Sequence, residues 1–283
     1  MLRGLPRNKY DFHTNASRAC PEVVYLNIRK FRLQIMLAQI QYEGESFAID
    51  FSKPIDISLS LRGDDKNPIA WYLDSPKITP FRDGDFIGKV SEGASVNFNN
   101  IQFNPHAHGT HTECVGHISK EFFSINQSLK NFFFKVKLIS VSPELQSEDQ
   151  VISVAKLKEQ IKDSCPEALV IRTLPNYIEK RSKKYSHTNW PYLSEEAMLF
   201  IRQLNIKHLL IDLPSVDKEK DEGKLLAHKA FWNYPKNTRF EATITELIYV
   251  PNHVSDGDYF LNLQIASFEN DAAPSKPVLY KIQ

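Results

Sequence analysis

The stretch LSEEAMLFIRQLNIKHLLIDLPSVD, residues 193–217, decides the fold class of this 283-residue chain. Ser194 is a favourable helix N-cap, and the apolar residues after it recur at helical spacing until Asn205 ends the helix. Residues 207–213 then have the composition of a buried strand. A helix that leads directly into a buried strand indicates an α/β fold.

Polar residues follow this strand, from Asp212 through Ser215 to Asp217. They stand just past the carboxyl end of a buried strand, where α/β proteins tend to bind ligands. A turn stabilised by side-chain hydrogen bonds is the alternative interpretation.

The rest of the chain continues the alternation of strands and helices. Short stretches rich in Val, Ile and Phe predict strands at 46–51, 55–61, 95–102, 132–141, 168–172, 208–213 and 241–250. Apolar spacing predicts a further helix over 147–163. Because the sequence has no internal repeat and no sharp change of composition, we expect one domain over residues 36–283.

Residues 1–35 differ in character from the rest of the chain. They are rich in Arg, Lys and Asn, their apolar positions keep no sustained period, and they lack the apolar run of a secretory signal. We expect Met36 to be the natural start and residues 1–35 to be a poorly ordered extension.

Bulk composition excludes some classes of partner. Lysine plus arginine (35) nearly cancels aspartate plus glutamate (34), so no global field favours nucleic acid or an anionic membrane. No apolar run reaches the roughly 18 to 20 residues that span a bilayer. Three cysteines at unrelated spacings suit a reducing compartment. We therefore expect a cytoplasmic protein that acts on a small molecule.

The segment NPHAHGTHTECVGH, residues 104–117, holds four of the nine histidines. In an extended chain His111 and Glu113 lie on one face and can bind the same ion. Imidazole with carboxylate suits zinc, manganese or ferrous iron, and the lack of paired cysteines argues against a closed structural zinc site. A polar loop of hydrogen-bonded histidines is the alternative. Cys114 faces the opposite way, so we expect a buried thiol and not a nucleophile.

This segment resembles the signature His-x-Gly-Thr-His-x-Asp-x-Pro-x-His of the cyclase-like metal-dependent hydrolases, which include bacterial kynurenine formamidases. The residues that match it directly are Gly109, Thr110, His111 and His117. Glu113 stands where the family has Asp, and Val115 replaces the proline. The carboxylate is thus kept but is one methylene longer.

The first histidine of the signature should lie at position 107, which is Ala107 here. Histidines stand on both sides of it, at His106 and His108. A one-residue bulge near Gly109 could bring either into the ligand position. We favour His106, because it keeps a spacer before the Gly-Thr-His turn.

The resemblance continues along the chain. WPYLS at 190–194 and LIDLPSVD at 210–217 resemble ordered family blocks, and His228 and Glu246 then match the helical histidine and strand glutamate that complete a two-metal site. Taken alone, His228 could be an ordinary helix residue and Glu246 an exposed strand residue. Glu241 is a competing carboxylate, but it would face the opposite side of a regular strand.

Near the N-terminus, NPIAW at 67–71 resembles the family segment whose tryptophan lines the substrate pocket. Trp71 is therefore a candidate substrate-binding residue, and a place in the core is the alternative.

The resemblance implies a site for one or two divalent metals per chain, with zinc favoured and manganese as the alternative. The ligands would be His106 (or His108), His111 and Glu113 for the first metal, and Glu113, His228 and Glu246 for the second. His117 would be the catalytic proton shuttle. The implied fold is a single α/β domain of the swivelling β/α/β type, with a mixed central sheet or barrel-like core flanked by helices.

The implied activity is hydrolysis, through a metal-bound hydroxide, of a linear amide such as N-formylkynurenine or of a small cyclic amide or ester. Two alternatives keep the same site: a non-catalytic metal- or ligand-binding relative, and a metal-dependent lyase or dehydratase. The resemblance also implies a homodimer or homotetramer.

Overall fold

The computed structural model describes residues 35–161 and 166–283. By its internal contacts, Ile35–Gln283 is one compact unit. Apart from Ile35, the predicted N-terminal extension lies outside the described residues. In the described part of the chain, no helix has both the length and the apolar character needed to cross a membrane.

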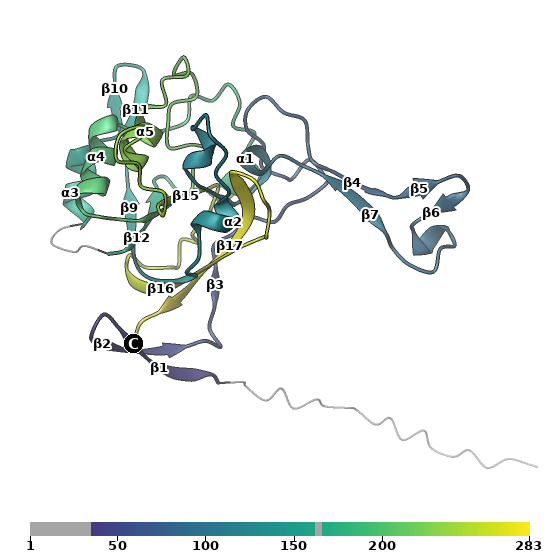
Figure 1. The fold of residues 1–283 in the computed structure, drawn as a ribbon, viewed down its shortest axis with the longest axis horizontal. Coiled ribbons are helices and arrows are strands. Elements are labelled where there is room, and N and C mark those ends of the chain that lie inside the picture. The colour runs from purple at the N-terminus through teal and green to yellow at the C-terminus, as the bar shows by residue number, and fades with distance from the viewer. Residues whose placement is uncertain (1–34, 162–165) are drawn as a thin grey trace, which may run out of the picture. The chain divides into compact units, whose positions relative to one another are not determined.

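A closed barrel of seven strands forms the centre of the structure (Figure 1). In order around the barrel, the strands are β16 (Gly257–Ile265), β9 (Phe133–Val141), β12 (Ala168–Thr173), β14 (His208–Ile211), β15 (Thr243–Glu246), β8 (His111–Glu113) and β17 (Ala272–Lys281). The β16–β17 pairing closes the ring, and β3 (Ile55–Asp56) pairs with β17 outside it. Neighbours from β9 to β15 are parallel and all other pairs are antiparallel. The predicted single α/β domain with a mixed, barrel-like core is therefore confirmed.

Strand β12 shows why this sequence makes a buried barrel wall. All six of its residues are buried, as expected for a parallel strand covered on both faces. Ala168 and Val170 pack in one apolar core with residues of β16 and β17. Leu169 and Ile171 point to the other face and pack in a second core with the helices. The side-chain alternation of a strand thus divides the interior into two layers.

Three helices cover the second core: α3 (Val154–Ile161), α4 (Glu195–Gln203) and α5 (Leu226–Trp232). The predicted start of α4 is confirmed, because the Ser194 side chain accepts a hydrogen bond from Ala197 N at 3.1 Å. The predicted end is confirmed as well, since Asn205 has the left-handed φ of 57°. Shorter helical turns are α1 (Pro105–His108), α2 (Ile125–Ser128), η1 (Val90–Glu92), η2 (Val115–His117) and η3 (Ile178–Ser182).

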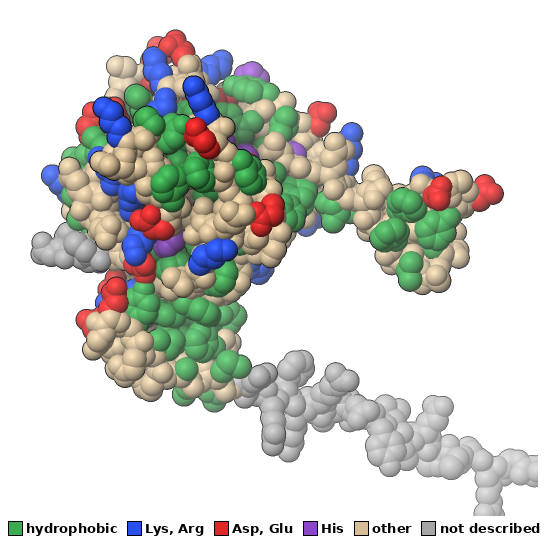
Figure 2. Space-filling view, in the orientation of Figure 1, with side chains coloured by type: hydrophobic (Ala, Val, Ile, Leu, Met, Phe, Trp, Pro, Cys, Tyr) green, Lys and Arg blue, Asp and Glu red, His purple; other side chains and the backbone are tan. Residues whose placement is uncertain are grey.

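Smaller sheets accompany the barrel. They are β1 (Leu37–Tyr42) with β2 (Glu45–Asp50), β4 (Lys77–Pro80) with β7 (Asn99–Gln102), β5 (Arg82–Asp83) with β6 (Phe86–Ile87), and β10 (Glu144–Gln146) with β11 (Asp149–Ile152) and β13 (Tyr192–Leu193). The β4–β7 ribbon carries β5 and β6 at its end, where apolar side chains gather at the surface (Figure 2). Phe86 and Phe98 are among the exposed apolar residues of this segment.

Several predicted elements were wrong in part. The helix predicted for 147–163 begins only at Val154, because Asp149–Ile152 is strand β11. A tight turn at Ser147, with φ of 56°, sends that strand back along β10, and β13 pairs with its other edge. The strand predicted for 241–250 is shortened to Thr243–Glu246, since Leu247 has φ of 53° and leaves the extended conformation.

The strands predicted for 55–61 and 95–102 shrink to β3 and β7. The two long strands β16 and β17 were not predicted at all, although they close the barrel.

Candidate metal centre

The histidine-rich segment begins with one turn of helix. The Asn104 side chain accepts a hydrogen bond from His106 N at 2.9 Å, and Pro105 occupies the first helical position. Helix α1 ends at His108, and Gly109 then leads into β8. The segment therefore forms a helical turn, and the one-residue bulge considered from the sequence does not form there. Residues two apart on a helix project about 200° from each other, so His106 and His108 point in different directions.

The structure brings His106 into the cluster and turns His108 away from it. His106 Nδ1 lies 3.1 Å from Glu113 Oε2. His108 Nδ1 accepts a hydrogen bond from Asn104 N at 2.8 Å, and its Nε2 lies 2.9 Å from Asp74 O. Both ring nitrogens of His108 are therefore engaged by the backbone.

Strand β8 places His111 and Glu113 on one face, and both are fully buried. His111 Nδ1 donates to Gly109 O at 3.0 Å, which fixes the tautomer and leaves Nε2 with a free lone pair. His111 pairs in register with Glu246 on β15, and His111 Nε2 is 3.5 Å from Glu246 Oε2. The adjacent strand thus supplies the second buried carboxylate.

His228 enters the cluster from helix α5. Its Nδ1 is hydrogen-bonded to Asp217 Oδ2, and its Nε2 lies 3.1 Å from Glu113 Oε1 and 3.9 Å from Glu246 Oε1. Asp217 also accepts hydrogen bonds from the Ala227 and His228 amides at the start of α5. The polar residues after β14 therefore hold the helix and orient its histidine. Glu241, the competing carboxylate, is exposed and lies outside the cluster.

His117 lies at the more accessible side of the cluster, with 30% of its side chain exposed. Its Nδ1 is 3.8 Å from Glu113 Oε2 and 3.3 Å from Asp271 Oδ2. Asp271 Oδ2 is also 2.8 Å from His106 Nε2. Asp271 is not among the residues that the sequence pattern indicates, and nothing in its local sequence signals this position.

Charge is strongly coupled within the cluster. Burial alone would raise the pKa of the Glu113 carboxyl, but the surrounding imidazoles, His117 foremost, hold it well below its usual value. Burial alone would lower the pKa of His106, but the Asp271 and Glu113 carboxylates raise it to about 10. The carboxylates on either side of His228 raise its pKa in the same way, against the effect of burial. The carboxylates thus favour positive charge within the cluster, and a bound cation would supply it.

The donor set fits a divalent metal. Within the described residues, His111 Nε2 and Glu113 Oε2 are buried and form no hydrogen bond. A buried acceptor without a partner costs about 1–3 kcal/mol. Ligand atoms of His106, His111 and Glu113 lie within 4.8 Å of one another, as do those of Glu113, His117 and His228. A zinc or manganese ion would satisfy both free acceptors with ligand types that these metals prefer.

Trp71 lies on a loop that is attached to the histidine segment. Ala70 N donates to Ala107 O at 3.0 Å, and the Asn67 side chain donates to His108 O at 2.8 Å. The Trp71 ring meets Trp190 edge-on at 5.0 Å between centroids. Trp71 is half-buried and packs against a small apolar cluster.

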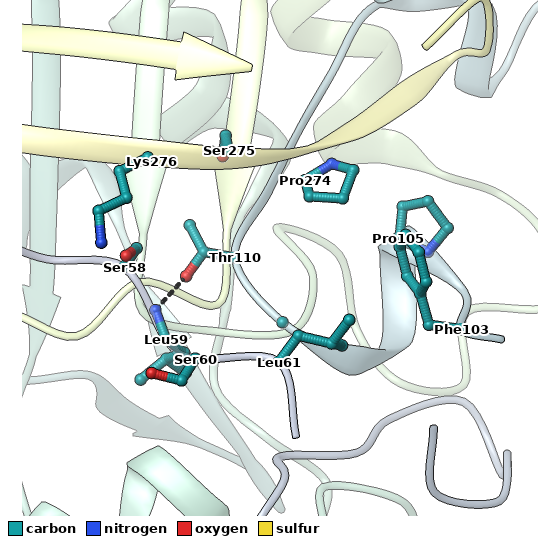
Figure 3. A pocket seen from close by; sticks show the side chains of 11 residues that line it. Ser58, Leu59, Ser60, Leu61, Phe103, Pro105, Thr110, Pro274, Ser275 and Lys276 are labelled. Carbon is teal, nitrogen blue, oxygen red and sulfur yellow. Dashed lines mark hydrogen bonds between the residues drawn. The ribbon is translucent and has the colours of Figure 1, made fainter. Parts of the chain in front are cut away.

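A cavity of about 220 Å³ lies beside the histidine segment (Figure 3). Thr110 and Pro105 line it from that segment, and Pro274 lines it from β17. The Thr110 hydroxyl accepts a hydrogen bond from Leu59 N at 2.7 Å, which the figure shows as a dashed line. None of the described cluster side chains lines this cavity, so it is separate from the metal cluster.

Cys114 has the predicted place in the core. It is fully buried among apolar residues, its Sγ lies 3.4 Å from Phe123 O, and burial raises the pKa of its thiol. The thiol is thus poorly suited to act as a nucleophile.

Comparison with known proteins identifies the family of this chain and structures that share its fold. Residues 49–218 match the family model described as "Putative cyclase". No curated protein matches the chain. A solved structure of a "predicted metal-dependent hydrolase" from Bacillus stearothermophilus is similar at a TM-score of 0.57 and 17% identity, over 81% of this chain and 98% of that one.

Two isatin hydrolases A are also similar in structure. The one from Labrenzia aggregata gives a TM-score of 0.60 at 13% identity, over 82% of this chain and 94% of that one. The one from Ralstonia solanacearum gives 0.58 at 13% identity, over 81% and 91%. At such low identity these similarities establish the shared fold.

Proposed function

The chain belongs to this cyclase family, and from that premise we propose that it is a metal-dependent hydrolase of amide or ester bonds. The observation that carries the proposal is the convergence of buried imidazole and carboxylate groups around two acceptor atoms, His111 Nε2 and Glu113 Oε2, that form no hydrogen bond within the described chain. Such an arrangement is costly in a protein core unless a cation occupies it.

The residues present divide into two sets of ligands. His106, His111 and Glu113 would hold one ion, and Glu113, His228 and Glu246 would hold a second. A divalent metal in such a site lowers the pKa of a bound water from 15.7 towards about 7 and polarises a carbonyl group. Asp217 keeps the His228 ring oriented by binding its Nδ1, which leaves Nε2 for the metal.

His117 is the group best placed to move a proton. It is more exposed than the cluster's buried ligands, and its Nδ1 lies near two carboxylates, Glu113 and Asp271. An imidazole in this position can receive a proton at Nε2 and deliver it to the leaving nitrogen or oxygen. We assign it this role.

For the substrate we propose a linear amide such as N-formylkynurenine or a small cyclic amide or ester. Isatin, which names two of the similar structures, is a cyclic amide. Trp71 is proposed as an apolar contact for the substrate, supported by the hydrogen bonds that tie its loop to the histidine segment.

The test is turnover on a panel of an N-aryl formamide, an aryl lactam and a small lactone, run in ¹⁸O-labelled water. We expect one class of substrate to be hydrolysed, with one labelled oxygen in the product. His117→Asn should retain the metal and lose about 10²- to 10⁴-fold in kcat. His253→Asn, at an exposed histidine, is the matched control and should leave kcat unchanged. Product without label would contradict hydrolysis and favour a lyase, and metal without turnover would favour a binding protein.

A further inference from the structure

Asp271 lies, like Glu113, within ion-pair distance of both His106 and His117. A single oxygen, Oδ2, lies 2.8 Å from His106 Nε2 and 3.3 Å from His117 Nδ1. The two imidazole rings are stacked, with centroids 4.2 Å apart and an interplanar angle of 28°. One carboxylate thus meets the edges of two parallel rings.

Backbone hydrogen bonds tie the segment around Asp271 to strand β8 and helix α2. Its carbonyl accepts a hydrogen bond from Cys114 N at 3.0 Å, and the next residue, Ala272, pairs in register with Glu113. On its other side, Asn270 O accepts a hydrogen bond from Ile125 N at 2.8 Å. The position of the carboxylate is therefore set by the strand that carries the ligands.

For His106 the contact determines which nitrogen is free. Nδ1 faces Glu113 Oε2, so donation of the Nε2 hydrogen to Asp271 leaves the Nδ1 lone pair directed into the cluster. A histidine that binds a metal through one nitrogen commonly donates the other N–H to a carboxylate, which fixes the ring and strengthens the ligand. For His117, the same carboxylate holds Nδ1–H and leaves Nε2 as the nitrogen that can exchange a proton with substrate.

We propose that Asp271 is a positioning residue that fixes the tautomer and orientation of both His106 and His117. The His117 part rests on the proposed function, whereas the His106 part concerns metal binding alone. The competing role is direct ligation, since side-chain atoms of His106, His117 and Asp271 also lie within 4.8 Å of one another. Direct ligation is the weaker interpretation, because Asp271 Oδ2 already faces a ring nitrogen of each histidine.

The test measures Zn²⁺ binding to the metal-free full chain by competition with a chromophoric chelator. Asp271→Asn keeps the size of the side chain and removes its charge, and Asp271→Ala removes both acceptor oxygens. We expect both variants to bind zinc about 10- to 100-fold more weakly, at unchanged stoichiometry. Glu269→Gln is the control, because this exposed carboxylate on the same loop accepts hydrogen bonds from the Asn126 and Gln127 side chains. It should bind zinc as the wild type does.

A second readout separates positioning from a general loss of structure. Imidazole ¹⁵N–¹H correlation spectra of the zinc-loaded protein should show His106 protonated at Nε2 alone. In Asp271→Ala that Nε2–H signal should broaden or vanish through exchange with water, while the His208 signals stay in place. Zinc affinity within twofold of the wild type in both variants would overturn the inference. Loss of one zinc ion per chain with normal affinity for the rest would overturn it in favour of direct ligation.

Kinetic measurements test whether Asp271 also affects turnover. If the chain hydrolyses a substrate of the panel, Asp271→Asn should lower kcat at least about 10-fold with KM little changed, since an acid–base group mainly affects the chemical step. If no substrate is turned over, the proposed function fails while the zinc measurements still test the role of Asp271 towards His106.

Discussion

Replacing His106 or His108 by alanine tests which of the two candidate histidines is the metal ligand. In the structure His106 Nδ1 faces Glu113, whereas both ring nitrogens of His108 are bound to backbone atoms of Asn104 and Asp74. We therefore expect His106→Ala to impair metal binding and His108→Ala to impair stability. The two variants are matched controls for each other, because they remove the same side chain from the same helical turn.

The size of each effect can be worked out from the interactions that each substitution removes. Zinc binding of about 10–16 kcal/mol, shared by about four ligands, gives about 3 kcal/mol per ligand, or about 100-fold in Kd for His106→Ala. His108→Ala loses two hydrogen bonds worth about 1 kcal/mol each, which lowers Tm by about 4–8 °C in a domain of this size. The assays are chelator competition for the Kd and calorimetry of the metal-free proteins for Tm. Equal loss of zinc affinity in both variants would refute the assignment of His106.

Three further substitutions test how residues outside the metal cluster contribute to stability. Burial and nearby positive charges lower the pKa of His208 in the folded chain to about 3. Between about pH 3 and pH 6.5 the unfolded chain therefore binds more protons at this residue than the folded chain does. The contribution of His208 to the free energy of unfolding is therefore complete above about pH 6.5 and falls by about 1.4 kcal/mol for each pH unit below it. In urea unfolding, the stability of His208→Gln should depend less on pH than that of the wild type. Gly116→Ala would place a Cβ 2.2 Å from Phe123 O, so its urea midpoint should fall by the equivalent of about 1–3 kcal/mol, and an unchanged midpoint would contradict the packing. Glu219→Gln removes the carboxylate charge that accepts hydrogen bonds from the Tyr72 hydroxyl and from the His187 and Asn189 amides. We expect the same assay to show about 1–3 kcal/mol of destabilisation. An unchanged urea midpoint would show that these contacts do not depend on the charge.

Much of the cluster could be predicted because it is local in sequence. His106, His111, Glu113 and His117 lie within twelve residues, and the alternation of an extended strand puts His111 and Glu113 on one face. The family resemblance then suggested His228, whose place beside Glu113 depends on helix α5. The resemblance and the mixed barrel were both confirmed.

The choice between His106 and His108 needed the structure. Sequence spacing suggested a bulge, but the Asn104 cap and Pro105 start a helical turn instead. Because residues two apart on a helix point in different directions, the helical turn directs His106 into the cluster and His108 away from it.

Asp271 could not be predicted because its role arises from distant strand pairing. It lies 154 residues from His117 along the chain, and only the β17–β8 pairing brings it there. The helix predicted for 147–163 failed for a related reason. The apolar residues of Asp149–Ile152 satisfy a helical period, yet two neighbouring strands take up their backbone hydrogen bonds.

We propose the histidine and carboxylate cluster as a catalytic metal centre. Its most direct test is elemental analysis of the purified wild type and of His111→Ala, followed by titration of the metal-free wild type with Zn²⁺ or Mn²⁺ while hydrolysis is recorded. We expect one or two ions per chain in the wild type, loss of metal in His111→Ala, and activity that returns in step with metal binding. A wild-type protein that binds no divalent metal, or one that is equally active without it, would contradict the claim.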